Sequence, residues 1–279
     1  MTDSRSDAEL SRDVAQEAGQ LLLNLRQDFL SQWESAVGSP LDKDSATRLR
    51  DQADAAAHVM ISTALSAARP SDAILSEEGK DSAERLSADR VWIVDPLDGT
   101  WEYGQNRRDF AVHIALWEPG TGVLSACSVD LPAQEIARTM LDVTQSPPAL
   151  PIDRPIRIVA SRSRPPATLA AAVEILGSRL AAAGVTALGV EIVDVGSVGA
   201  KVNEILCGRA EAYVHDTGFY EWDVAAPYGV ASHYGLIASH VDGSPVTFNH
   251  MPPYVNDLVV AHPDLHGELL MALAEAASL

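Results

Sequence analysis

The sequence is poor in basic residues, in cysteine and in long apolar runs. Its 279 residues include 20 Lys and Arg against 39 Asp and Glu, which gives a formal net charge of −19. This balance argues against a nucleic-acid polymer as partner, because proteins that bind one present a basic surface. No apolar run approaches the roughly 18 residues that span a bilayer, so we expect no insertion into a membrane.

Cysteine occurs only at Cys127 and Cys207. So few thiols in a chain of this length indicate a reducing compartment and no disulfide framework. The segment from Met1 to Asp13 is polar and acidic and has no apolar core of the kind found in secretory signals. These features predict a cytoplasmic protein.

Three common catalytic signatures are also missing. The chain has neither the G-x-S-x-G turn of serine hydrolases nor the G-x-x-x-x-G-K-[ST] loop of P-loop enzymes. Its histidines show no spacing typical of zinc ligands, and we expect them to be structural. A nucleophilic serine, a P-loop and a zinc centre are therefore not supported.

The spacing of apolar residues changes along the chain. Apolar side chains recur every three or four positions over 7–30 and over 45–68, which predicts two helices with a loop at 36–44 between them. The pattern then shortens to strand-like runs. We expect strands at 73–75, 91–94, 110–117, 123–129 and 134–141.

Prolines cluster over 144–155, which we interpret as the connection between two lobes, residues 1–150 and residues 151–279. In the second lobe short apolar runs alternate with helical patterns, which favours an α/β unit. The expected strands are 156–160, 190–194 and 210–214, and the expected helices are 166–183, 198–207, 222–234 and 263–276.

The most informative segment is D-P-L-D-G-T, from Asp95 to Thr100. A buried strand is expected to end there in two carboxylates, and the proline between them stiffens the turn so that both can face one small volume. Carboxylate oxygens suit hard divalent cations, and the backbone N–H groups of Gly99 and Thr100 can bind a phosphate at a helix start. The alternative is a tight turn in which Asp98 only caps a helix.

Two other acidic segments could likewise be either metal ligands or ordinary structural features. Glu77 and Glu78 follow a short apolar run, and Asp223 stands where a helix is expected to begin. The alternatives are a solvated acidic pair in the first case and an ordinary helix cap in the second. A metal site requires the three segments to converge in the fold.

Together these three segments resemble the inositol monophosphatase superfamily. S-E-E-G at 76–79 is similar to its G/S-E-E motif, and W-I-V-D-P-L-D-G-T at 92–100 is similar to its W-I/L-V-D-P-L/I-D-G-T signature. W-D-V-A-A at 222–226 is similar to its W-D-x-A-A/G motif. The resemblance covers about residues 45–260. It implies an α/β (α+β) fold, a layered α/β/α/β/α sandwich with an antiparallel sheet in the first lobe and a mixed sheet in the second.

The resemblance also implies a metal-dependent phosphatase, with about two to three Mg²⁺ ions per site. Asp95 would bridge two of the ions. The implied ligands are Glu77, Asp95, the backbone carbonyl of Leu97, Asp98 and Asp223, and all of these except Asp95 are also implied as substrate contacts.

Other residues would handle the phosphate and the attacking water. Gly99 and Thr100 would hold the phosphate, while Thr100 and an aspartate of the family's A-D motif would orient the water. That aspartate best matches Asp54, and Asp51 stays open as the alternative because it replaces the family's usual threonine. Glu77 would act with them by holding the ion beside the water, which attacks directly without a covalent enzyme intermediate.

Segments outside these motifs are more similar to the 3'(2'),5'-bisphosphate nucleotidase branch. W-E-Y at 101–103 resembles its K-E-F, and I-V-A-S-R-S-R at 158–164 resembles its V-x-S-R-S-H. Arg162, Arg164 and Lys201 could then neutralise the second phosphate of 3'-phosphoadenosine 5'-phosphate. Tyr220 or Trp222 could stack on its adenine. The expected reaction is hydrolysis of the 3'-phosphate to AMP and phosphate, in sulfate assimilation, and 3'-phosphoadenylyl sulfate is a further candidate substrate.

Three alternatives stay open. The same site could act as an inositol-1-phosphatase or as a fructose-1,6-bisphosphatase, or the chain could be a catalytically inactive metal or metabolite sensor. The presence of Thr100 and Asp54 argues against the sensor. The resemblance further implies inhibition by lithium and a homodimer that acts on small phosphorylated nucleotides, sugars or inositols.

Overall fold

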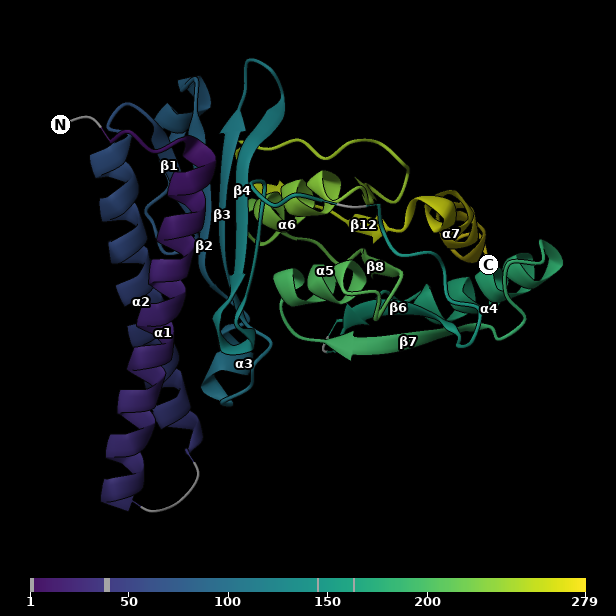
Figure 1. Cartoon of the computed structure of the whole chain (residues 1–279), viewed down its shortest axis with the longest axis horizontal. Coiled ribbons are helices and arrows are strands. Elements are labelled where there is room, and N and C mark those ends of the chain that lie inside the picture. The colour runs from purple at the N-terminus through teal and green to yellow at the C-terminus, as the bar shows by residue number, and fades with distance from the viewer. Residues whose placement is uncertain (1–2, 38–40, 145, 163) are drawn as a thin grey trace.

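Figure 1 shows the computed structural model of the chain, which describes residues 3–37, 41–144, 146–162 and 164–279. Four predicted segments therefore lie partly outside the described residues. These are the acidic N-terminal segment, the loop at 36–44, the connection at 144–155 and the arginine segment at 158–164, which lose residues 1–2, 38–40, 145 and 163, respectively.

Within the described residues the chain folds into alternating layers of helix and sheet (Figure 1). A helical pair covers one face of the first sheet, a second pair lies between the two sheets, and a third covers the outer face of the second sheet. In order, the pairs are α1 (Asp7–Val37) with α2 (Lys43–Ala68), α5 (Val198–Leu206) with α6 (Glu221–His233), and α4 (Leu169–Ala182) with α7 (Pro263–Ala276). The α/β/α/β/α sandwich implied by the family resemblance is confirmed.

The first sheet has the strand order β1-β2-β3-β4-β5. Its strands are β1 (Ala73–Ser76), β2 (Val91–Asp98), β3 (Ala111–Glu118), β4 (Val123–Leu131) and β5 (Ile136–Thr139). β1 pairs with β2 in parallel, and the other pairs are antiparallel. The expectation of an antiparallel sheet is therefore wrong at the β1 edge. The chain between β1 and β2 contains the short helix η1 (Ala83–Ser87) and is long enough to return to the same end of the sheet.

The second sheet is mixed, with the order β10-β12-β8-β6-β7. Its strands are β6 (Ile156–Ser161), β7 (Val190–Val195), β8 (Ala212–His215), β10 (Ile237–Ser239) and β12 (Leu258–Ala261). β10 and β12 were not predicted, because runs of three or four residues give too little periodicity. Shorter elements complete the fold, namely α3 (Thr100–Gly104), η2 (Pro132–Gln134), β9 (Phe219–Tyr220) and β11 (Tyr254–Val255).

The first helices differ from the prediction at their junction. α1 continues to Val37 instead of ending near residue 30, and α2 begins at Lys43. Residues 31–35 of α1 are mostly exposed, so its last turns carry no apolar stripe that a sequence pattern could detect. Asp42 caps α2 by accepting a hydrogen bond from the Ser45 backbone N–H at 2.7 Å.

β2 distributes its side chains over both faces of the first sheet. Trp92 and Val94 pack in the cluster under α1 and α2, while Val91 and Ile93 pack in the cluster that contains α5 and α6. That second cluster also includes Val159 of β6, so the apolar core continues from one predicted lobe into the other. The division at about residue 150 stays a prediction. No helix in the described ranges combines the length and apolarity needed to cross a membrane.

Candidate active site

β2 ends in the two carboxylates that the sequence singled out. The whole strand is buried, including Asp95 and Asp98. Its register against β3 is regular as far as Asp95, which lies opposite His113, and then shifts before Asp98. The Leu97 backbone N–H donates to Asp95 Oδ1 at 2.9 Å within this irregular turn. The shift brings both carboxylates to one side of the strand end.

Asp223 joins them from the first turn of α6. Carboxylate oxygens of Asp95, Asp98 and Asp223 all lie within 4.8 Å of one another, close enough to hold one metal ion. Asp223 Oδ2 also accepts a hydrogen bond from the Tyr220 backbone N–H at 2.8 Å, which caps the helix. The helix cap considered as an alternative therefore coexists with a place in the acidic cluster.

Glu77 and Asp54 add two further acids. Glu77 follows β1, and its carboxyl group lies close enough to that of Asp95 for the two to affect each other's pKa. Asp54 is buried in α2, and its Oδ1 has no hydrogen-bond partner among the described residues. Asp51, one turn earlier in α2, is exposed. The geometry favours Asp54 over Asp51 as the carboxyl group that acts at this site.

Burial and mutual repulsion raise the pKa values of the Asp54, Glu77, Asp95 and Asp223 carboxyl groups. The pKa of Glu77 is raised to about 7, and those of Asp54 and Asp223 to about 8, in each case by burial first and by neighbouring carboxylates second. The same causes hold the pKa of the buried Asp95 carboxyl well above its ordinary value. Asp95, Asp98 and Asp223, whose oxygens lie within metal-binding distance of one another, form a donor set that suits a divalent cation, and Glu77 and Asp54 add acidic groups close to it.

Asp98 is held in place by the start of α5. Its Oδ2 accepts hydrogen bonds from the backbone N–H groups of Val198 at 2.6 Å and Gly199 at 3.2 Å, and it lies 3.4 Å from His113 Nε2. These contacts dock α5 against the end of β2 and fix the orientation of the carboxylate. The sequence did not reveal them, because backbone donors have no residue signature.

Gly99 makes the turn from β2 into α3. Its φ of +86° is in the left-handed region that favours glycine. Because the chain reverses at this residue, Thr100 begins α3 beside the acidic cluster instead of continuing the strand. The structure thus places the two residues predicted to hold phosphate next to Asp98.

A cavity of about 200 Å³ opens at this point and contains most of the predicted substrate contacts. Those in its lining are Asp98, Gly99, Thr100, Arg162, Arg164, Lys201 and Asp223. Glu77 and Asp95 lie outside this lining; Asp95 is buried, whereas Glu77 is exposed. The Leu97 side chain packs in the core under α1 and α2, so this residue can face the site only through its backbone.

The three basic residues predicted to bind the second phosphate differ in how many partners they already have within the protein. Arg162 forms ion pairs with Glu102 at 3.3 Å and with Asp109 at 3.8 Å. Lys201 is buried, burial lowers its pKa, and its Nζ donates to the backbone carbonyls of Gly196 and Ser197. Among the described residues Arg164 forms no ion pair, and its charge lowers the pKa of the neighbouring Asp223. Arg164 is therefore the cation most available to a ligand.

The predicted adenine platform is wrong. Tyr220 and Trp222 stack on each other, with ring centroids 4.6 Å apart, and neither lines the cavity. The rings in the lining are instead those of Trp101, Tyr213, Phe219 and His215. Sequence analysis treated His215 as structural and did not propose the other three as ring contacts, because the rings come from α3, β8 and β9 and meet only in the folded chain.

The sequence profile of the inositol monophosphatase family matches residues 3–278. The chain belongs to the inositol monophosphatase family. It is an enzyme of that family's phosphatase type, and the family is generally metal-dependent. The acidic cluster built by β2 and α6 is where such a family member could hold its metal.

Close relatives within the inositol monophosphatase family share most of the chain. The 3'-phosphoadenosine 5'-phosphate phosphatase of Mycobacterium leprae (strain TN) is 37% identical over 279 residues, which cover 97% of this chain and 94% of the relative. The protein of the same name from Mycobacterium tuberculosis (strain CDC 1551 / Oshkosh) is 38% identical over 266 residues, covering 93% and 90%.

Solved structures agree with this assignment. The crystal structure of CysQ from Bacteroides thetaiotaomicron, described as a bacterial member of the family, is 25% identical. It covers 93% of this chain and 98% of its own, with a TM-score of 0.69. The resemblance to the family and to its bisphosphate nucleotidase branch, inferred from the acidic motifs and the segments beside them, is confirmed.

Proposed function

We propose that this protein is a magnesium-dependent phosphatase that converts 3'-phosphoadenosine 5'-phosphate to AMP and phosphate. The observation that carries the proposal is the charge distribution of one cavity. Asp98 and Asp223 lie in the same lining as Arg162, Arg164 and Lys201. Relatives at 37–38% identity bear the name of this activity.

A bisphosphate nucleotide suits a cavity that is lined by both acidic and basic side chains. The phosphate to be cleaved requires cations held by the acids, whereas the second phosphate requires a positive group of the protein itself. Arg164, which has no carboxylate partner among the described residues, supplies that group. Trp101 and Phe219 offer apolar ring surface for a base.

Magnesium fits the donor set. Asp95, Asp98 and Asp223 would hold one ion, and Glu77 with Asp95 a second, because Mg²⁺ prefers carboxylate oxygens and keeps part of its water shell. The Leu97 carbonyl completes the proposed ligands, and a third ion would be bound with the substrate. Such cations, when bound, polarise phosphoryl oxygens and acidify water.

The chain's own residues would handle the proton and the geometry. Thr100, at the first position of α3, would orient the attacking water, and the Gly99 and Thr100 backbone would hold the phosphate. Asp54 would accept the proton of that water, since its pKa falls once the charges of the acids around it are neutralised. Water oxygen forms the new bond to phosphorus, and the bond to the 3'-oxygen breaks, with no covalent intermediate on the protein.

The test is phosphate release with Mg²⁺ on 3'-phosphoadenosine 5'-phosphate, 3'-phosphoadenylyl sulfate, inositol 1-phosphate and fructose 1,6-bisphosphate. The proposal predicts the highest kcat/KM for the first substrate, by about tenfold or more over the last two, since inositol 1-phosphate lacks a second phosphate and neither of the two has a base. An equal or higher kcat/KM on inositol 1-phosphate would reject the nucleotidase assignment. No release from any of the four would favour a sensor.

The proposal includes three further properties implied by the family resemblance. Lithium should inhibit the reaction, the chain should form a homodimer, and the protein should act in the cytoplasm as part of sulfate assimilation. The first is measured by adding lithium to the Mg²⁺ assay, and the second by light scattering on a sizing column.

A further inference from the structure

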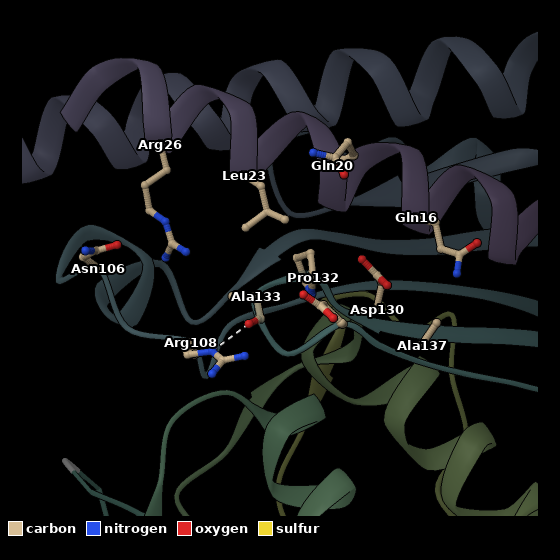
Figure 2. Close-up of a pocket in the computed structure, with 11 residues that line it drawn as sticks. Gln16, Gln20, Leu23, Arg26, Asn106, Arg108, Asp130, Pro132, Ala133 and Ala137 are labelled. Carbon is tan, nitrogen blue, oxygen red and sulfur yellow. Dashed lines mark hydrogen bonds between the residues drawn. The ribbon is translucent and has the colours of Figure 1, made fainter. Parts of the chain in front are cut away.

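A second cavity, of about 750 Å³, lies between α1 and the end of the first sheet at which β4 stops (Figure 2). Its lining comes from three places in the sequence and shares no residue with the lining of the catalytic cavity. α1 contributes Gln16, Gln20, Leu23 and Arg26, the loop before β3 contributes Asn106 and Arg108, and the turn from β4 to β5 contributes Asp130, Pro132, Ala133, Glu135 and Ala137.

Asp130 is the first unusual group of this cavity. It is only 6% exposed, and its carboxyl forms no hydrogen bond or ion pair with any described residue. Figure 2 shows the side chain rising from β4 towards α1. Burial raises its pKa to about 7. An unpartnered buried carboxyl destabilises a fold, so a group that hydrogen-bonds to it would recover free energy.

α1 is built to accommodate this carboxyl. A Cβ atom at Gly19 would lie 2.0 Å from Asp130 Oδ2 and 2.9 Å from Pro132 Cβ. Glycine in a helix interior is less stable than alanine by about 1 kcal/mol. An apolar side chain at position 130 would allow alanine at position 19, and it would remove the cost of the buried carboxyl. Retaining both Gly19 and Asp130 is reasonable if the carboxyl binds something.

Two arginines without carboxylate partners line the same cavity. Arg26 is 8% exposed, donates to the Arg107 carbonyl at 2.7 Å and lies over the rings of Tyr103 and Phe110. Arg108 donates to the Ala133 carbonyl at 2.7 Å, the dashed line in Figure 2. Neither forms an ion pair within the described chain, although acids greatly outnumber bases in this sequence.

We propose that this cavity binds a small organic anion that also carries a hydrogen-bond donor. Arg26 and Arg108 contact the anionic group, and Asp130 accepts from the donor. Both guanidinium groups already use one donor on a backbone carbonyl, which fixes their planes and leaves further N–H groups for the ligand. The site is independent of the catalytic cavity and of the substrate proposed for it.

The probe is 2-aminoethylphosphonate, which has an anion, an ammonium donor and a carbon–phosphorus bond that is not a phosphate ester. Ethylphosphonate, which lacks the donor, is its matched partner. Binding of each is measured by isothermal titration calorimetry in the presence of Mg²⁺. Wild-type protein should bind 2-aminoethylphosphonate saturably, and Asp95→Asn should bind it equally well, because this substitution alters only the catalytic cluster.

Two variants test the assigned contacts. Arg108→Gln should weaken binding of both probes by about tenfold, the value of a charge-assisted hydrogen bond. Asp130→Asn should weaken binding of 2-aminoethylphosphonate by about tenfold and leave ethylphosphonate unchanged. Arg48→Gln is the control for a lost positive charge, since Arg48 is exposed in α2 and bonds only to Ser45; it should bind both probes as wild type does.

Three outcomes would overturn the proposal. They are no saturable binding to the wild type, loss of binding in Asp95→Asn, and unchanged affinity in both Arg108→Gln and Asp130→Asn. Thermal unfolding of each variant separates a lost contact from a lost fold. The substrate panel is a separate assay, so failure here leaves the proposed phosphatase activity standing.

Discussion

The catalytic cluster and the second cavity both contain buried carboxyl groups with raised pKa values, but the charged residues around those carboxyl groups differ. Around Asp95 the nearest charges are other carboxylates. Around Asp130 burial alone raises the pKa, and the cavity contains two arginines that form no ion pair within the described chain. A buried acid therefore does not by itself indicate which ligand it binds; the other charged groups that line its cavity must be considered with it. The first site calls for a cation and the second for an anion with a donor.

The largest difference should appear when the same substitution is made in each cavity. Asp95→Asn should lower kcat/KM by on the order of a thousandfold, because it removes the carboxylate shared by the proposed ions. Asp130→Asn, the matched change, should leave kcat/KM within about twofold. Phosphate release at saturating Mg²⁺ measures both, with circular dichroism to show that each variant is folded. Equal losses in the two variants would contradict the separation of the sites.

Metal removal should affect stability in a pH-dependent way. Raised carboxyl pKa values mean that, without cations, the folded state keeps protons which the unfolded state loses above about pH 4. In chelator, the free energy of unfolding should therefore fall as the pH rises from 5 to 8. Millimolar Mg²⁺ should then raise the melting temperature more at pH 8 than at pH 5. At pH 8, a hundredfold excess of Mg²⁺ over Kd should add about 3 kcal/mol to the free energy of unfolding. A larger gain at pH 5 would argue against carboxylate ligands.

Asp130 should also make the free energy of unfolding fall as the pH rises, but this effect should not depend on metal. Its pKa rises from an ordinary 3.8 to about 7, so its contribution is favourable at pH 4 and is lost as the pH rises through 7. Asp130→Asn should thus be more stable than the wild type at pH 8, by about 3–4 kcal/mol, and similar at pH 4. Urea unfolding at the two pH values measures this, and Mg²⁺ should not alter the difference. A variant that is less stable at pH 8 would show that the carboxyl has an internal partner.

The smallest predicted effect distinguishes the arginines of the two cavities. Arg164→Gln should raise KM for 3'-phosphoadenosine 5'-phosphate about tenfold and leave kcat/KM for inositol 1-phosphate nearly unchanged, because only the nucleotide has a second phosphate. Arg108→Gln, the matched change in the second cavity, should alter neither. Initial rates on both substrates provide the comparison. Similar losses on both substrates would place Arg164 at the cleaved phosphate instead.

The sequence predicted features that are set within one short segment better than contacts between distant segments. The segment from Asp95 to Thr100 carries its own turn chemistry, and the structure shows the buried strand, the irregular turn and the helix start that this segment predicted. Convergence with Asp223 could be expected only from the family resemblance, since 125 positions separate Asp98 from Asp223. That convergence depends on α6 packing on the first sheet.

Features set by packing could not be predicted. The pairing of Gly19 with Asp130, and of Asp98 with the start of α5, joins distant segments through a missing Cβ or through backbone N–H groups. The error over Tyr220 has the same origin, because its place in the sequence next to Asp223 does not determine which way the ring points. Register and side-chain direction follow from contacts across the fold.

The central claim is that Asp95, Asp98 and Asp223 jointly hold a divalent cation beside Gly99 and Thr100. Crystals grown with Mn²⁺ in place of Mg²⁺ test it most directly, through the anomalous difference density of the metal. The account predicts a peak within about 2.5 Å of an oxygen from each of the three carboxylates. Well-ordered density for all three side chains with no peak between them, at saturating Mn²⁺, would contradict it.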